Sequence, residues 1–179
     1  MSAAAAFVVW AGAAAIVLAD GRRGLALGLG LIAVGLGVVA WTGAGWPAAL
    51  LLLIGGGVAA ARRLRSGPPG WMFMPPGSTP RLILSIFGGL VALWIAVVVA
   101  GGGSAETRYA ALVVIGMMVA RILLGRDPAM VFTAATAVAL AVAAAASLSP
   151  ADPGLAPYAI AALVAGGTAF LPAASPRAA

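Results

Sequence analysis

Hydroxyl side chains are the main groups within the apolar segments of this sequence that could contact a solute. Thr133 and Thr136 are three residues apart, which places both on one face of a helix, and we expect this pair to line a polar path if one exists. Ser85 and Thr168 are further candidates for the lining. Hydroxyls of this kind also commonly bond to the carbonyls of their own helix, and that is the competing interpretation.

Most of the chemistry that enzymes use is missing from this sequence. It has no cysteine and no histidine, and its ten basic residues are all arginine, so thiol nucleophiles, imidazole ligands and lysine Schiff bases are excluded. Glu106 and Asp152 fall in Gly- and Pro-rich stretches that are typical of solvated loops. We therefore expect a protein that is not an enzyme, with no catalytic residue, no metal site and no cofactor.

The composition indicates an integral membrane protein. Hydrophobic residues make up 64% of the 179 residues and charged residues 8%, against roughly a quarter charged in an ordinary soluble domain. The net charge of +6 does not indicate a nucleic-acid partner, because the arginines lie in short connections between apolar runs, where they orient a membrane protein. The use of Ala, Gly, Val and Arg without Lys is typical of a GC-rich bacterial genome, so we expect the bacterial inner membrane.

Seven apolar runs predict an all-α, polytopic transmembrane bundle of short, Gly/Ala-rich helices that forms one domain over residues 1–179. The shortest runs fall below the ~20 residues needed to cross a bilayer core, and the third is the least secure. Asp127 followed by Pro128 is a helix cap and first-turn pair, which predicts the start of the sixth helix. The predicted spans are 3–19, 24–41, 47–61, 82–100, 109–124, 129–148 and 157–171.

The positions of the arginines predict the orientation of the bundle. If seven helices alternate, every arginine except Arg108 falls on or near one side, Arg177 in the tail and Arg121 included. The positive-inside rule then places the N-terminus outside and the C-terminus in the cytoplasm. The arginines that we expect to contact lipid headgroups and set this orientation are Arg22, Arg23, Arg62, Arg63, Arg65, Arg81 and Arg126.

Arg121 is the one charged residue well inside a predicted helix. It lies about one turn from the cytoplasmic end of its run, so we expect its long side chain to extend to the headgroups. Two alternatives stay open, a buried ion pair with Asp127 and a contact with a substrate.

Small residues are expected to bring the helices together, because lipid supplies no hydrophobic force between them. Gly24 and Gly28 form a GxxxG pair, and Gly35 and Gly55 lie in the second and third runs. We expect these four glycines at helix-packing surfaces, within the bundle or against a partner.

The predicted cytoplasmic loop, residues 62–81, contains four consecutive apolar residues between two Pro-Pro-Gly turns: Trp71, Met72, Phe73 and Met74. This segment is too short to span a membrane. One interpretation is an interfacial anchor, with the aromatic rings at headgroup depth. Another is a docking site for a protein, since Trp and Met are enriched where proteins bind partners. A third is a gate or lid over a cytoplasmic vestibule.

Two functions follow from these observations. The first is a non-catalytic accessory or scaffold subunit that packs against partner helices in a larger membrane complex, with membrane lipids and other subunits, or further copies of itself, as partners. The alternative is a small transporter or channel for an apolar or neutral solute.

Overall fold

The computed structural model describes residues 2–66, 69–99, 104–124 and 127–171. Regular structure in these residues is entirely helical, apart from one isolated bridge between Ala19 and Phe73. A π-helical turn, Ile95–Val99, continues α4, and a 3₁₀ turn, Ala146–Leu148, continues α6. The helices are α1 (Ser2–Leu18), α2 (Arg22–Ala44), α3 (Trp46–Arg65), α4 (Thr79–Trp94), α5 (Ala105–Leu124), α6 (Pro128–Ala145) and α7 (Ala156–Phe170).

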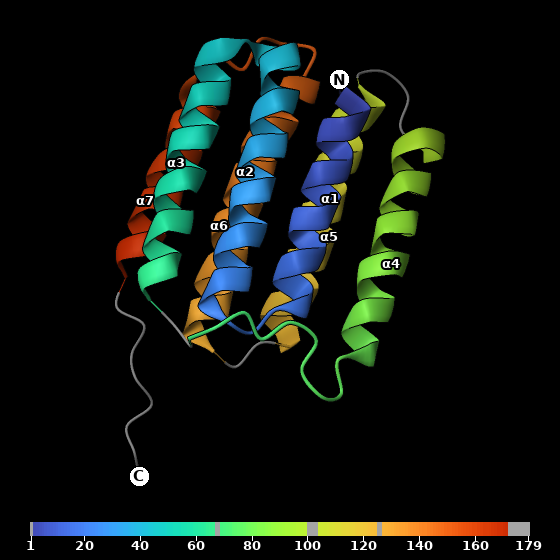
Figure 1. Ribbon diagram of the computed structural model, residues 1–179. Helices are drawn as coiled ribbons and strands as arrows, with labels where there is room; N and C mark the ends of the chain where they lie inside the picture. The colour runs from blue at the N-terminus through green and yellow to red at the C-terminus, as the bar shows by residue number, and fades with distance from the viewer. Residues whose placement is uncertain (1, 67–68, 100–103, 125–126, 172–179) are drawn as a thin grey trace.

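The helices stand in two rows (Figure 1). The front row contains α3, α2, α1 and α4, and the back row contains α7, α6 and α5. Helix α2 packs against α1 and α3 in its own row and against α6 behind it, whereas α4, at the end of the row, packs mainly against α1 and α5. Successive helices alternate in direction, so α1, α3, α5 and α7 all end at the same end of the bundle.

One end of the bundle is rich in arginine, and we call it the arginine-rich end. Glu106, Arg108 and Asp152 lie at the opposite end, so the described charges are distributed as the predicted alternation requires. Arg126 and Arg177 lie outside the described residues. The arginines at the arginine-rich end are Arg22, Arg23, Arg62, Arg63, Arg65, Arg81 and Arg121.

Four helical segments among the described residues are long and apolar enough to span a membrane. Helices α1 and α7 are apolar but shorter. The four segments are Arg22–Ala44, Trp46–Arg65, Thr79–Val98 and Pro128–Leu148.

The third helix is longer than the sequence analysis predicted. It continues past residue 61 to Arg65, because arginine is a good helix former and cations are favourable in the last turn of a helix. Arg81 lies inside α4, so the connection between the two helices is residues 66–78 and not 62–81. The third run, the least secure of the predicted spans, is thus part of one of the four helices that are long enough.

Three of the four predicted packing glycines allow close helix contacts within the chain. A Cβ atom on Gly28 would lie 2.7 Å from the carbonyl oxygen of Gly12 in α1, and one on Gly35 would lie 2.8 Å from that of Ala5. In α3, a Cβ on Gly55 would lie 2.6 Å from the Cα of Ala162 in α7. These distances are shorter than real Cβ contacts, so the backbones can approach only because the side chains are absent.

We predict that Gly28→Ala lowers the stability of the bundle in detergent by about 1–3 kcal/mol, because the new methyl group overlaps the backbone of α1. Gly30→Ala is the matched control, since nothing lies within 4 Å of the added Cβ in the same helix. The two variants are compared by measuring the free energy of unfolding of each in mixed micelles. Equal stability of the two variants would contradict the close packing of α1 on α2.

Candidate functional site at the arginine-rich end

Residues 70–74, which we call the strap, lie across the turn between α1 and α2 at the arginine-rich end (Figure 1). The backbone N–H of Asp20 donates to the carbonyl of Met72 at 3.1 Å, and the N–H of Met74 donates to the carbonyl of Leu18 at 3.0 Å. The bridge between Ala19 and Phe73 belongs to the same pairing. Backbone groups that the end of α1 leaves unpaired are therefore satisfied by the strap.

The strap also caps α2. The N-cap residue of α2 is Gly21, which has no side chain to accept a hydrogen bond, and the N–H of Arg23 donates instead to the carbonyl of Gly70 at 3.2 Å. A Cβ atom on Gly21 would lie 2.8 Å from the carbonyl carbon of Gly70. Glycine at position 21 is thus required for the strap to approach this closely.

The strap holds its apolar side chains half exposed on a fixed backbone. Met72 and Met74 have φ angles of 41° and 49°, a left-handed conformation that non-glycine residues rarely adopt without surrounding support. The rings of Trp71 and Phe73 stack with their centroids 6.0 Å apart. The exposed fractions of the four side chains are 48% for Trp71, 49% for Met72, 40% for Phe73 and 52% for Met74.

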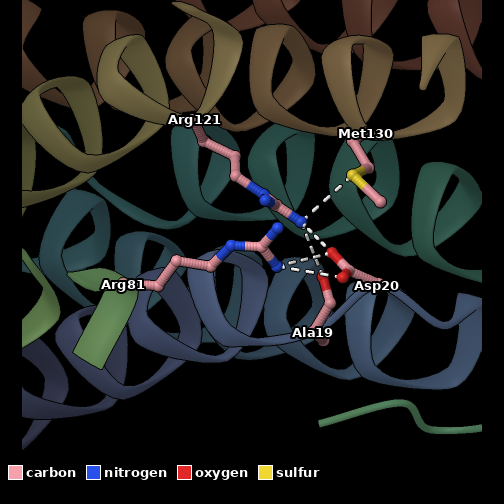
Figure 2. Close-up of polar contacts among 5 residues, drawn as sticks. All are labelled: Ala19, Asp20, Arg81, Arg121 and Met130. Atoms are coloured by element: carbon pink, nitrogen blue, oxygen red, sulfur yellow. Dashed lines mark hydrogen bonds and ion pairs between the residues drawn. The ribbon is translucent and has the colours of Figure 1, made fainter. Parts of the chain in front are cut away.

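An ion cluster lies at the α1–α2 turn, to which the strap is hydrogen-bonded (Figure 2). One guanidinium nitrogen of Arg81, from α4, donates to both carboxylate oxygens of Asp20, at 2.8 and 2.9 Å. Arg121, from α5, also donates to this carboxylate, and the same nitrogen lies 3.0 Å from the carbonyl oxygen of Ala19 and 3.0 Å from the sulfur of Met130. One carboxylate therefore joins the α1–α2 turn to the start of α4 and the end of α5.

The expectation that Arg121 extends to the lipid headgroups is wrong. Its side chain is 3% exposed and pairs with Asp20, and not with Asp127. The carboxylate of Asp127 instead accepts a hydrogen bond from the N–H of Ala129 at 2.9 Å, as the predicted helix cap requires. The bundle brings Asp20 and Arg121 together although they are 101 residues apart in the chain.

The two arginines keep Asp20 ionised. Burial by itself raises the pKa of this carboxyl, but the hydrogen bonds and charges of Arg121 and Arg81 outweigh burial and hold the pKa below its ordinary value of 3.8. A carboxyl with a lowered pKa in the folded state contributes stability above its unfolded pKa, and that stability is lost as the pH falls through the folded value. The contribution of Asp20 is therefore fully present at neutral pH.

The arginines predicted to contact headgroups differ in exposure. Arg23, Arg62 and Arg65 are exposed, and Arg62 also lies over the ring of Phe170, 5.3 Å from its centroid. Arg63, in contrast, is buried, with 7% of its surface exposed. Arg22 is partly buried, and Arg81 is partly buried and bound to Asp20.

Gly24 contacts the strap and not another helix. The nearest atoms to a Cβ at this position belong to Ala19, Trp71 and Phe73, and the carbonyl oxygen of Trp71 would be 3.0 Å away. The two glycines of the GxxxG pair therefore make different contacts: Gly24 lies against the strap, and Gly28 lies against α1.

The hydroxyl groups of the candidate polar lining already form hydrogen bonds within the bundle. Thr133 and Thr136 are buried and donate to the carbonyls of Ala129 and Phe132 at 2.7 and 2.8 Å. The hydroxyl of Thr136 also lies 2.7 Å from that of Thr168, and Ser85 donates to a carbonyl of its own helix. These contacts match the competing interpretation of the hydroxyls.

Comparison of the chain with protein-family models, curated proteins and solved structures finds no match. The strap, the ion cluster and the apolar helices are therefore the features that bear on function.

Asp20 was not among the site residues expected from the sequence. The residue stands in an Asp-Gly break between two apolar runs, where it resembles an ordinary turn. One signal was available, because Asp20 and Asp127 are the two carboxylates on the predicted side of Arg121, and Asp127 is already explained as a helix cap.

We predict that Asp20→Asn destabilises the folded protein by about 3 kcal/mol, because Arg121 then remains buried without a compensating charge. Asp152→Asn makes the same chemical change in an exposed loop, and it should alter the free energy of unfolding by less than about 0.5 kcal/mol. Denaturant unfolding in micelles at neutral pH compares the two. A value below 0.5 kcal/mol for Asp20→Asn would show that the ion cluster does not hold the bundle.

Proposed function

We propose that this protein is a multi-pass protein of the bacterial inner membrane and serves as a non-catalytic accessory or scaffold subunit of a larger membrane complex. In this proposal the strap is the docking surface for a partner protein on the cytoplasmic side. The supporting observation is that four consecutive apolar side chains stand half exposed on a backbone fixed by hydrogen bonds to α1 and α2.

The construction of the strap favours docking over a purely interfacial anchor. An anchor needs only apolar side chains near the headgroups, whereas this segment has its backbone paired on both sides of the α1–α2 turn. A surface that is already ordered loses little conformational entropy when a partner binds, and Trp and Met are favoured contact residues. Arg23 and Arg65 are exposed at the same end, so the complementary partner surface is apolar with carboxylates around it.

We also propose that all seven helices cross the membrane with the arginine-rich end in the cytoplasm. The short helix α7, of 15 residues, reaches about 22 Å, so its flanking residues or a locally thinned bilayer must supply the remainder. Trp41 and Trp46 are exposed at the opposite end, where they suit the outer membrane–water interface. Nothing comparable supports a transport path, because the hydroxyls of Thr133 and Thr136 are buried and bonded to their own helix.

Cysteine labelling tests this orientation, since the natural chain contains no cysteine. Ser149→Cys, in the exposed connection before α7, should react with a membrane-impermeant maleimide on intact spheroplasts. Ser66→Cys, just after α3, should react only after the membrane is permeabilised. The reverse pattern would show that the arginine-rich end faces outward.

Partner recovery tests the docking surface. We expect the tagged protein, purified in mild detergent from its native host, to bring a stoichiometric membrane partner. Replacing Trp71 and Phe73 together with alanine should reduce that recovery by about tenfold or more, since central aromatic contacts carry much of a binding energy. Membrane insertion should be unchanged.

Replacing Trp41 and Trp46 together with alanine is the matched control, because these are exposed aromatics at the other end of the bundle. The control should retain the partner. Equal recovery from wild type and from the strap variant, or a wild-type protein that is purified alone, would contradict the proposed function.

A further inference from the structure

A hollow in the bundle surface lies between α2 and α3 beside the strap. Its volume is about 420 Å³, and it is lined almost wholly by apolar side chains. It exists because alanines occupy positions where larger residues would fill the space between the two helices. The lining residues are Arg23, Ala26 and Leu27 of α2, Ala60, Ala61 and Leu64 of α3, and Trp71 of the strap.

The mouth of this groove carries positive charge that no described carboxylate neutralises. Arg23 lines the groove itself, and Arg65 follows Ala61 by four residues and so lies on the same face of α3. Among the described residues at this end, Asp20 is bound to Arg81 and Arg121, and Asp127 caps α6. An anion at the mouth would therefore meet the exposed guanidinium of Arg23, which lines the groove, while the exposed Arg65 lies one helical turn beyond Ala61. Neither described carboxylate at this end is free to compete for these arginines.

We propose that the groove binds one anionic phospholipid. An acyl chain lies along the alanines of α2 and α3, the phosphate lies between Arg23 and Arg65, and the indole of Trp71 covers the chain at headgroup depth. An apolar trough with a cationic mouth matches the amphipathic structure of such a lipid, and each arginine near the headgroups favours an anionic one. The proposed lipid site requires the protein to lie in a membrane, as the proposed function states. It does not depend on the docking of a partner at the strap.

Native mass spectrometry of the purified protein tests this site, with dioleoylphosphatidylglycerol and dioleoylphosphatidylcholine as matched probes. The wild type should retain the anionic lipid about fivefold or more over the zwitterionic one. Arg23→Gln should lower retention of the anionic lipid about fivefold and leave the other unchanged. Ala61→Phe fills the groove without a change in charge, and it should lower retention of both lipids.

Arg62→Gln is the matched control for Arg23→Gln, because it also removes one arginine at the arginine-rich end, but from the side of α3 that faces Phe170 of α7. It should bind both lipids as the wild type does. Equal retention of the two lipids by the wild type, or equal losses in Arg23→Gln and Arg62→Gln, would overturn the proposal. Lipid retention is measured without a partner protein, so it can be observed even if the strap binds no partner. Conversely, partner recovery can be observed even if the groove binds no lipid.

Discussion

The carboxylate of Asp20 is the contact on which the arginine-rich end depends. It neutralises Arg121, whose side chain is buried, and it also binds Arg81 at the start of α4. A buried arginine without such a partner is strongly destabilising, so the position of the α1–α2 turn is constrained by the position of α5. The strap binds to this same turn through Leu18 and Asp20. The ion cluster therefore positions the turn, and the turn positions the exposed side chains of the strap.

The small residues mainly mediate contacts between helices of the same protein. Gly28 and Gly35 admit α1, and Gly55 admits α7, so these faces are already occupied by helices of the same bundle. Helix α4 differs, because it packs on α1 and α5 at the edge of the bundle and exposes a broad apolar face, as a helix in contact with lipid does. For this reason the strap, and not a glycine surface, is the feature that we assign to partner binding.

Much of the fold could be predicted from the sequence because it depends on local properties. Apolar runs and breaks identify seven helices, Asp127 and Pro128 mark the start of α6, and alternation alone places every described arginine except Arg108 at one end. The end of α3 was misplaced because a charged stretch resembles a loop although arginine favours helix. The site itself depends on tertiary contacts: the partner of Arg121 is 101 residues distant, and Met72 and Met74, with their left-handed backbone, are hydrogen-bonded to Asp20 and Leu18. No local pattern in the sequence reports either contact.

A double-mutant cycle between Asp20 and Arg121 tests the central claim most directly. The free energy of unfolding in micelles is measured for the wild type, Asp20→Asn, Arg121→Met and the double variant. If the two side chains form the pair that holds this end of the bundle, the double variant should be less destabilised than the sum of the single variants, by about 1–3 kcal/mol. Additive losses, equal within about 0.5 kcal/mol, would show that the two residues act independently and would contradict this account.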